Sequence, residues 1–211
     1  MTDQADAVRE QELLIDTDGG PARVLLRPTP HQPRGLLMLG HGAGGGVGAP
    51  DLLTATGVAG DLGWHVALVE QPYRVAGRRA PAPARQLDTA WTQVAMHLRN
   101  GAFAGLPVVV GGRSSGARVA CRTATDLGAI GALCLAFPLQ PPKDRPSRLP
   151  ELESAGVPVL VVQGERDRFG MPPAAPERTV VTVAGDHSLK KDQDAIAGAV
   201  RDWLTGLPAS A

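Results

Sequence analysis

The sequence predicts an α/β fold in which a mostly parallel sheet of about eight strands is covered by helices on both faces. From about residue 35 to the C-terminus, short runs of β-branched and aliphatic residues alternate with segments of helical periodicity. This alternation is typical of βαβ units, whose strands are buried between two helical layers. The 211 residues are 43% apolar and 20% charged, which suits one domain with a substantial core. We therefore expect residues 1–211 to form a single three-layer domain.

The predicted strands begin with a hairpin. Residues 12–15 and 23–26 are separated by Asp16-Thr17-Asp18-Gly19-Gly20, a turn signal that favours two antiparallel strands. The next six strands are short apolar runs bounded by turn residues. They are expected at residues 36–39, 65–69, 107–110, 132–136, 159–162 and 179–183.

Two segments outside these strands carry apolar residues at helical spacing. In the first segment, apolar residues recur at intervals of four, three and four, which places them on one face of a helix. They are Leu87, Trp91, Val94 and Leu98. The second segment has the same kind of stripe at Ile196, Val200 and Leu204. We interpret both stripes as core packing against the sheet.

Composition excludes several classes of partner. Lysine plus arginine and aspartate plus glutamate each number 21, so net charge draws the chain neither to nucleic acid nor to an anionic membrane. Residues 1–12 lack the apolar segment of a secretory signal, and the apolar runs are too short to span a bilayer. We expect a soluble cytoplasmic protein and predict no particular oligomeric state. Cys121 and Cys134 lack metal-ligand spacing and are expected to be reduced packing residues, with no metal or organic cofactor.

The pentapeptide Gly112-Arg113-Ser114-Ser115-Gly116 is the strongest functional signal. It follows an apolar run and precedes a helix-like stretch, which is the context of a nucleophile elbow. Such a turn holds the serine in a strained, exposed conformation, and the flanking glycines let strand and helix pass closely. Ser115 does not fit the nucleophile position, because glycines would not flank it.

Two further side chains are expected at the same rim of the sheet. Asp167 follows the strand at 159–162 and His187 follows the strand at 179–183, and the carboxyl ends of parallel strands converge at one edge. With Ser114 they give the chain order Ser, Asp, His of one form of the catalytic triad. His187 would take the proton from Ser114, and Asp167 would orient the imidazole.

The alternative acids and bases fit this arrangement less well. Glu165 is the second choice of acid after Asp167, because it lies closer than Asp167 to the end of the strand at 159–162. Asp186 adjoins His187 in sequence and would struggle to reach its ring. His65 lies at the start of a strand, at the opposite edge, and His97 lies on a predicted helix.

A glycine-rich run supplies the remaining part of a hydrolytic site. It is His41-Gly42-Ala43-Gly44-Gly45-Gly46, and it directly follows the strand at 36–39. Backbone N–H groups aimed at a developing oxyanion lower the barrier to acyl transfer, and Ala43 and Ser115 are the expected donors. His41 is interpreted as a residue that ties the loop by hydrogen bonding.

These motifs resemble those of α/β-hydrolases, and among them the small, capless, dienelactone-hydrolase-like group that includes testis-expressed and chromatin-complex proteins. The resemblance extends from about residue 35 to the C-terminus. About twenty residues separate the strands at 132–136 and 159–162, which is too few for an inserted cap domain, so we expect an open, shallow site. Dienelactone hydrolases use a cysteine nucleophile, whereas the elbow here holds Ser114. We therefore expect a serine hydrolase of esterase or carboxylesterase type that acts on small acyl esters through an acyl-enzyme.

Two rival functions remain open. Gly40, Gly42 and Gly45 match the G-x-G-x-x-G pattern of dinucleotide sites, with Glu70 after the next strand. However, the following helix is predicted to start only near Pro50, too late for its N-terminus to meet a pyrophosphate held by the first glycines. The other rival is a catalytically silent hydrolase fold that serves as a binding or scaffold module.

Arginines near the predicted site suggest a preference for negatively charged substrates. Arg78 and Arg79 lie in the loop after the strand at 65–69, and Arg113 lies inside the elbow. We expect these three residues to attract an anionic ester or thioester, although exposed loop arginines are common without such a role.

Overall fold

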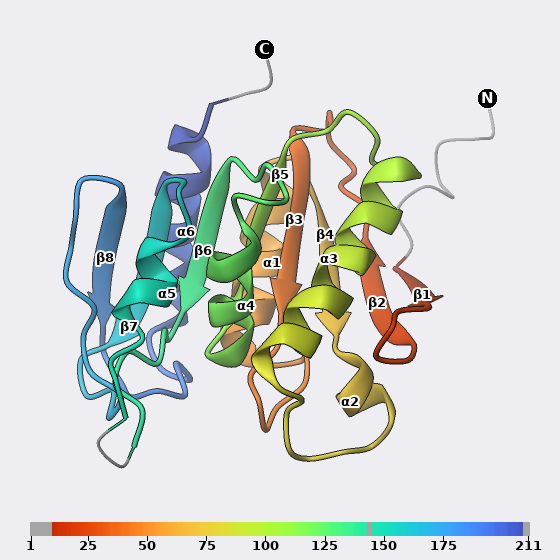
Figure 1. The fold of residues 1–211 in the computed structure, drawn as a ribbon. Coiled ribbons are helices and arrows are strands. Elements are labelled where there is room, and N and C mark those ends of the chain that lie inside the picture. The colour runs from red at the N-terminus through yellow and green to blue at the C-terminus, as the bar shows by residue number, and fades with distance from the viewer. Residues whose placement is uncertain (1–9, 143–144, 209–211) are drawn as a thin grey trace.

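A computed structural model describes residues 10–142 and 145–208, and in this part of the chain eight strands form one sheet (Figure 1). Their spatial order is β1-β2-β4-β3-β5-β6-β7-β8. The β1–β2 hairpin is antiparallel and pairs antiparallel with β4, whereas all the other pairs are parallel. The predicted mostly parallel sheet is therefore confirmed. The strands are β1 (Gln11–Ile15), β2 (Ala22–Arg27), β3 (Gly35–Gly40), β4 (Trp64–Glu70), β5 (Val108–Arg113), β6 (Gly131–Leu135), β7 (Val159–Gly164) and β8 (Arg178–Val183).

Helices lie on both faces of the sheet, as Figure 1 shows. One face is covered by α1 and α6, and the other by α3, α4 and α5. None of the helices in the described ranges is long and apolar enough to cross a membrane. The helices are α1 (Pro50–Asp61), α2 (Pro72–Val75), α3 (Ala84–Asn100), α4 (Ser115–Thr123), α5 (Leu149–Glu153) and α6 (Gln193–Gly206).

The sheet separates two hydrophobic cores. In β5, Val109 belongs to the core under α1 and α6, while Val108 and Val110 belong to the core under α3 and α4. Successive side chains of a strand point to opposite faces, so a strand that is buried on both faces is apolar at every position. The two predicted apolar stripes face these cores, since Trp91 and Val200 are almost fully buried.

β5 extends further than its apolar run indicates. The strand continues past residue 110 to Arg113, and Gly112 lies between Gly40 of β3 and Cys134 of β6. Glycine has a low strand propensity, so the strand predicted from the sequence ended too early, at residue 110. The missing side chain is what allows the neighbouring backbones to approach here, and this carries the strand up to the predicted elbow.

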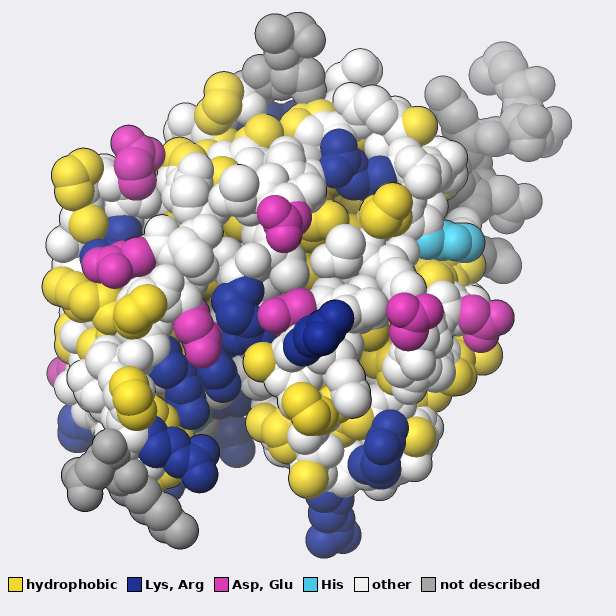
Figure 2. Space-filling model, viewed as in Figure 1, with side chains coloured by type: hydrophobic (Ala, Val, Ile, Leu, Met, Phe, Trp, Pro, Cys, Tyr) yellow, Lys and Arg dark blue, Asp and Glu magenta, His cyan; other side chains and the backbone are white. Residues whose placement is uncertain are grey.

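The connection between β6 and β7 adds no domain to the carboxyl edge of the sheet. In the described residues of this connection, α5 is the one helix, and no inserted unit covers the strand ends. Figure 2 shows a hollow in the lower part of the face that carries α3 to α5, with Lys and Arg side chains gathered in it. The carboxyl edge is therefore open to solvent at this hollow.

The two cysteines are packing residues, as predicted. Cys121 of α4 and Cys134 of β6 are free thiols in the core, with their Sγ atoms 3.4 Å apart. The hydrogen bond with Cys121, together with burial, raises the pKa of the Cys134 thiol well above its usual range. A buried, protonated thiol is a poor nucleophile, so Cys134 contributes to packing between α4 and the sheet.

Candidate active site

Ser114 occupies a sharp turn between β5 and α4. Its backbone has φ 53° and ψ −104°, a conformation that costs a non-glycine residue about 1–3 kcal/mol. The strain is held in place by the elements on both sides, because the Ser114 N–H donates to the Leu135 carbonyl of β6 at 2.9 Å. This turn projects the Ser114 hydroxyl beyond the carboxyl end of the sheet.

The glycines of the pentapeptide are required by a close approach to β3. A Cβ atom on Gly116 would lie 2.3 Å from the carbonyl oxygen of Gly40, and one on Gly112 would lie 2.4 Å from the same oxygen. Real Cβ atoms do not approach a backbone oxygen so closely. The first turn of α4 can therefore pass over β3 only because both positions lack a side chain.

Ser114, His187 and Asp167 form a continuous hydrogen-bonded chain. His187 Nδ1 lies 2.8 Å from Asp167 Oδ2, and His187 Nε2 lies 3.0 Å from Ser114 Oγ. With Nδ1–H donating to the carboxylate, Nε2 carries the lone pair that accepts from the serine hydroxyl. The loops after β5, β7 and β8 thus bring together the three side chains that the sequence places at one rim.

Asp167 is held by two donors that the sequence analysis did not identify. Gln163 of β7 donates from Nε2 to Asp167 Oδ2 at 2.8 Å, and the Phe169 N–H donates to Asp167 Oδ1 at 2.9 Å. The Phe169 ring also packs edge-on against the imidazole of His187, with ring centroids 4.5 Å apart. A lone glutamine in an otherwise apolar strand, Val159–Gly164, was the signal that could have revealed the first donor.

The rival acids have other partners. Glu165 is exposed and pairs with Arg166 at 2.6 Å. Asp186 accepts from the N–H and the hydroxyl of Ser188 at 2.9 and 2.6 Å, and these hydrogen bonds lower its pKa. In the described contacts, Asp167 is the carboxylate that meets His187.

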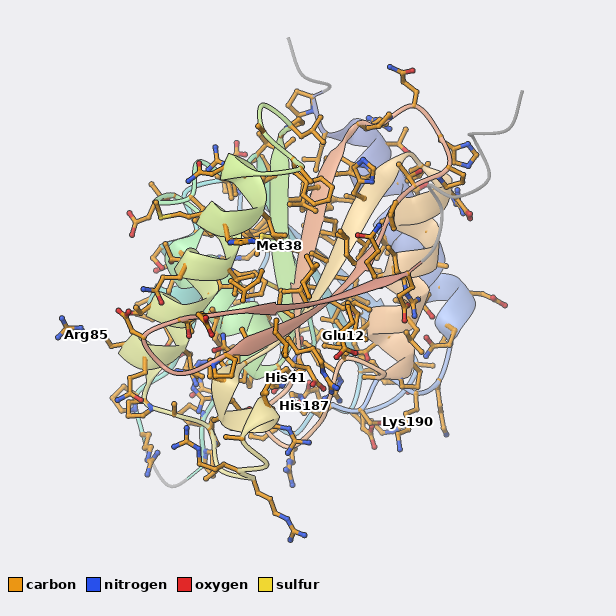
Figure 3. All side chains as sticks on the ribbon, turned by 90° about the vertical axis from the view of Figure 1, so that its right-hand side faces the viewer. Glu12, Met38, His41, Arg85, His187 and Lys190 are labelled. Atoms are coloured by element: carbon orange, nitrogen blue, oxygen red, sulfur yellow. The ribbon has the colours of Figure 1, made fainter. Side chains whose placement is uncertain are left out.

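His41 fixes the glycine-rich loop, in agreement with its expected role. Its Nδ1–H donates to the Gly42 carbonyl at 2.8 Å, and its Nε2 accepts from the Gln71 N–H at 3.1 Å. Burial lowers the pKa of His41 and favours this neutral form. The Tyr73 hydroxyl donates to the Ala43 carbonyl at 3.0 Å. Figure 3 shows His41 and His187 together at one end of the sheet, whereas Met38 lies within it.

Arg113 connects the elbow to α1 and to the histidine loop. Its Nε lies 3.0 Å from Oδ2 of the fully buried Asp51, and its Nη2 donates to the His187 carbonyl at 2.7 Å. Burial raises the pKa of Asp51 to about 6, although the charge of Arg113 opposes this rise. Arg113 thereby positions the backbone of His187.

The buried Asp51 predicts a pH-dependent stability. Because the folded protein keeps the Asp51 proton to higher pH than the unfolded chain, this carboxyl makes folding less favourable as pH rises from about 4 to about 6. We expect the free energy of unfolding of the wild type, minus that of Asp51→Asn, to fall by about 2 kcal/mol over this range. Urea denaturation at several pH values measures it, with the exposed Asp61→Asn as control. A difference that is constant with pH would contradict this assignment.

An open pocket of about 590 Å³ surrounds Ser114. Arg113 lines it, but Arg78 and Arg79 are exposed and do not belong to its lining. The lining residues are Ala43, Gly44, Gly45, Pro81, Arg113, Ser114, Ser115, Arg118, Pro138, Pro142, Arg148, Arg168, Phe169 and His187.

In the described part of the chain, no three His, Cys, Asp or Glu side chains are grouped so that they could hold a metal ion.

The sheet and the side chains at its carboxyl edge define the class of α/β serine hydrolases. The model of the α/β hydrolase domain family matches residues 33–199. The chain therefore belongs to the α/β hydrolase family.

Solved structures of three proteins share this fold. An α/β serine hydrolase homologue from Coxiella burnetii is 15% identical with a TM-score of 0.76, and the match covers 92% of this chain and 97% of that one. A lidless α/β serine hydrolase from Xanthomonas campestris is 20% identical (TM-score 0.72, coverage 96% and 97%). Dienelactone hydrolase from Anabaena variabilis is 14% identical (TM-score 0.73, coverage 95% and 99%). No curated protein matches the chain in sequence.

Proposed function

We propose that the protein is an esterase-like serine hydrolase that cleaves small acyl esters through an acyl-enzyme. The observation that carries this proposal is the hydrogen-bonded chain from Ser114 Oγ through His187 to Asp167. A serine hydroxyl becomes a useful nucleophile when an adjacent base is itself oriented by a third group. The contacts of His187 with Ser114 and with Asp167 meet both conditions, and this supports the proposal.

In the first half-reaction, Ser114 Oγ attacks the carbonyl carbon of the ester while His187 Nε2 takes the hydroxyl proton. Asp167 accepts from Nδ1–H and stabilises the imidazolium that forms. When the tetrahedral intermediate collapses, the bond to the alcohol oxygen breaks and His187 returns the proton to that oxygen. The acyl group is then attached to Ser114. His187 then takes a proton from water as the water oxygen attacks the acyl carbon. When this second tetrahedral intermediate collapses, the bond to Ser114 Oγ breaks, His187 returns the proton to Oγ, and the carboxylic acid is released.

The oxyanion of both tetrahedral intermediates is assigned to the N–H groups of Ala43 and Ser115. Ser115 is the first residue of α4, so its N–H has no intrahelical acceptor and lies at the positive end of the helix dipole. Ala43 lies in the loop that His41 and Tyr73 hold in place. Both residues line the pocket beside Ser114, which supports this assignment.

Covalent labelling tests the nucleophile directly. We expect a fluorophosphonate probe to modify the folded protein at Ser114 and to leave folded Ser114→Ala unmodified, because the probe reports an activated serine. Mass spectrometry of the intact protein and of its peptides measures the labelling. A folded wild-type protein that resists the probe would instead favour the catalytically silent binding or scaffold module.

A further inference from the structure

The charged lining of the pocket at Ser114 has one sign. Its four arginines are Arg113, Arg118, Arg148 and Arg168, and none of its described lining residues is an aspartate or glutamate. Figure 2 shows how Lys and Arg side chains gather in the hollow of this face. A concave site lined by one sign of charge attracts ligands of the opposite sign.

Two of the four arginines are already neutralised by carboxylates. Arg113 pairs with the buried Asp51. Arg118 donates to both oxygens of Glu151, at 2.7 and 2.6 Å. These ion pairs hold both guanidinium groups, so they contribute little uncompensated charge to the pocket.

Glu151 is shared with a further arginine outside the pocket. Arg122 donates to Glu151 Oε2 at 2.8 Å and also pairs with Asp88. Glu151 is therefore shared by Arg118 and Arg122, and in the described ranges it makes no ion pair with Arg148.

Arg148 and Arg168 differ from these paired arginines. Arg148 donates to the Pro138 carbonyl at 2.9 Å, and within residues 10–142 and 145–208 it makes no ion pair. Burial, and then the charge of Arg118, lower the pKa of Arg148. Arg168 lies over the Phe169 ring at 4.9 Å and likewise has no carboxylate partner in the described ranges. An anion in the pocket that both arginines line would relieve this excess of positive charge.

A second hollow of about 440 Å³ adjoins the pocket at Ser114, and Arg113, Arg168 and His187 line both. The other lining residues indicate which of the two hollows suits an anion better. The second hollow contains the carboxylate of Asp186, and Arg148 does not line it. The pocket that holds both Arg148 and the reacting Ser114 is therefore the more favourable of the two for an anion.

We propose that Arg148 and Arg168 form an anion subsite that selects esters carrying a carboxylate or phosphate on the acyl or alcohol part. The inference rests on the proposed esterase function and names its substrate class. Guanidinium groups bind both kinds of anion through paired, charge-assisted hydrogen bonds. Arg78 and Arg79, which the sequence suggested for this role, lie outside the pocket lining.

Matched pairs of esters test the subsite. The first pair is the mono-p-nitrophenyl ester of glutaric acid and p-nitrophenyl pentanoate, which places the charge on the acyl part. The second pair is 4-carboxyphenyl acetate and phenyl acetate, which places it on the alcohol part. We expect the wild type to prefer the anionic member of at least one pair, as measured by kcat/KM. Arg148→Gln/Arg168→Gln should lower kcat/KM for that anionic ester by about tenfold or more and leave the neutral ester nearly unchanged.

Three controls distinguish the subsite from general charge effects. The exposed Arg201→Gln, on α6, is the matched control and should keep the preference. Rising salt should weaken the preference, because it screens charges at an open site. If the protein hydrolyses the esters but prefers neither anionic ester, or if the preference survives in the double variant, the proposal is wrong. It is equally wrong if the preference disappears in Arg78→Gln/Arg79→Gln instead.

A binding experiment separates failure of the subsite from failure of the esterase function. Titration calorimetry with glutarate and with butyl phosphate uses the folded Ser114→Ala protein, so it does not depend on turnover. The subsite is supported if either anion binds and if this binding is lost when Arg148 and Arg168 are both replaced by glutamine. This holds even if no ester is hydrolysed. The two titrations distinguish carboxylate from phosphate. If neither anion binds and no anionic ester is preferred, the subsite is excluded while labelling at Ser114 still reports on the esterase function.

Discussion

Replacement of Ser114 by alanine is expected to lower kcat for ester hydrolysis by about 10⁴-fold or more. The variant removes the one hydroxyl that lies 3.0 Å from His187 Nε2, so no acyl-enzyme can form. His187→Ala should have a comparable effect, because it leaves the Ser114 hydroxyl without a base. Initial rates with p-nitrophenyl pentanoate, together with thermal unfolding of each variant, measure both effects and verify that the variants remain folded.

The double variant makes this prediction sharper. Residues that act as one unit are strongly non-additive, so Ser114→Ala/His187→Ala should be about as slow as either single variant. His97→Ala is the matched histidine control, because His97 is exposed near the C-terminal end of α3. This variant should keep the wild-type rate. If the two single losses multiply in the double variant, Ser114 and His187 act independently and the proposed mechanism is wrong.

The sequence predicted those parts of the fold that depend on local periodicity. β3 and β7 are apolar runs buried on both faces, and their positions could be read directly from the chain. The carboxyl end of β5 was placed too early, because Gly112 has no strand-forming side chain and only its neighbours Gly40 and Cys134 hold it in the sheet. Local propensity cannot report such pairing between distant segments.

The same distinction applies to the candidate site. Ser114, Asp167 and His187 each follow the carboxyl end of a strand, and this topological rule was enough to bring them to one rim. Arg148 lies in the β6–β7 connection and Arg168 follows Asp167, but no periodicity specifies which way these loop side chains face. For the same reason, nearness in sequence to a strand end did not place Arg78 in the pocket lining.

Replacement of Gly116 by alanine is expected to destabilise the protein by about 3 kcal/mol, and at the same time to displace the elbow. The added Cβ would lie 2.3 Å from the Gly40 carbonyl oxygen and 2.5 Å from the carbonyl carbon. Both are backbone atoms of β3, which is paired with β4 and β5 on either side, so they cannot rotate away as the end of a flexible side chain could. Relief requires α4 to move away from β3, and this shifts Ser114 and the Ser115 N–H together.

Gly198→Ala is the matched control, because it makes the same chemical change in a helix where nothing lies within 4 Å of the added Cβ. There the alanine should stabilise the protein by about 0.5–1 kcal/mol through its helix propensity. Urea denaturation should therefore give opposite signs for the two variants, and Gly116→Ala should also lose kcat because a nucleophile misplaced by even 1 Å reacts far more slowly. Equal stabilities, or full activity in Gly116→Ala, would mean that the contact between α4 and β3 does not set the position of the elbow.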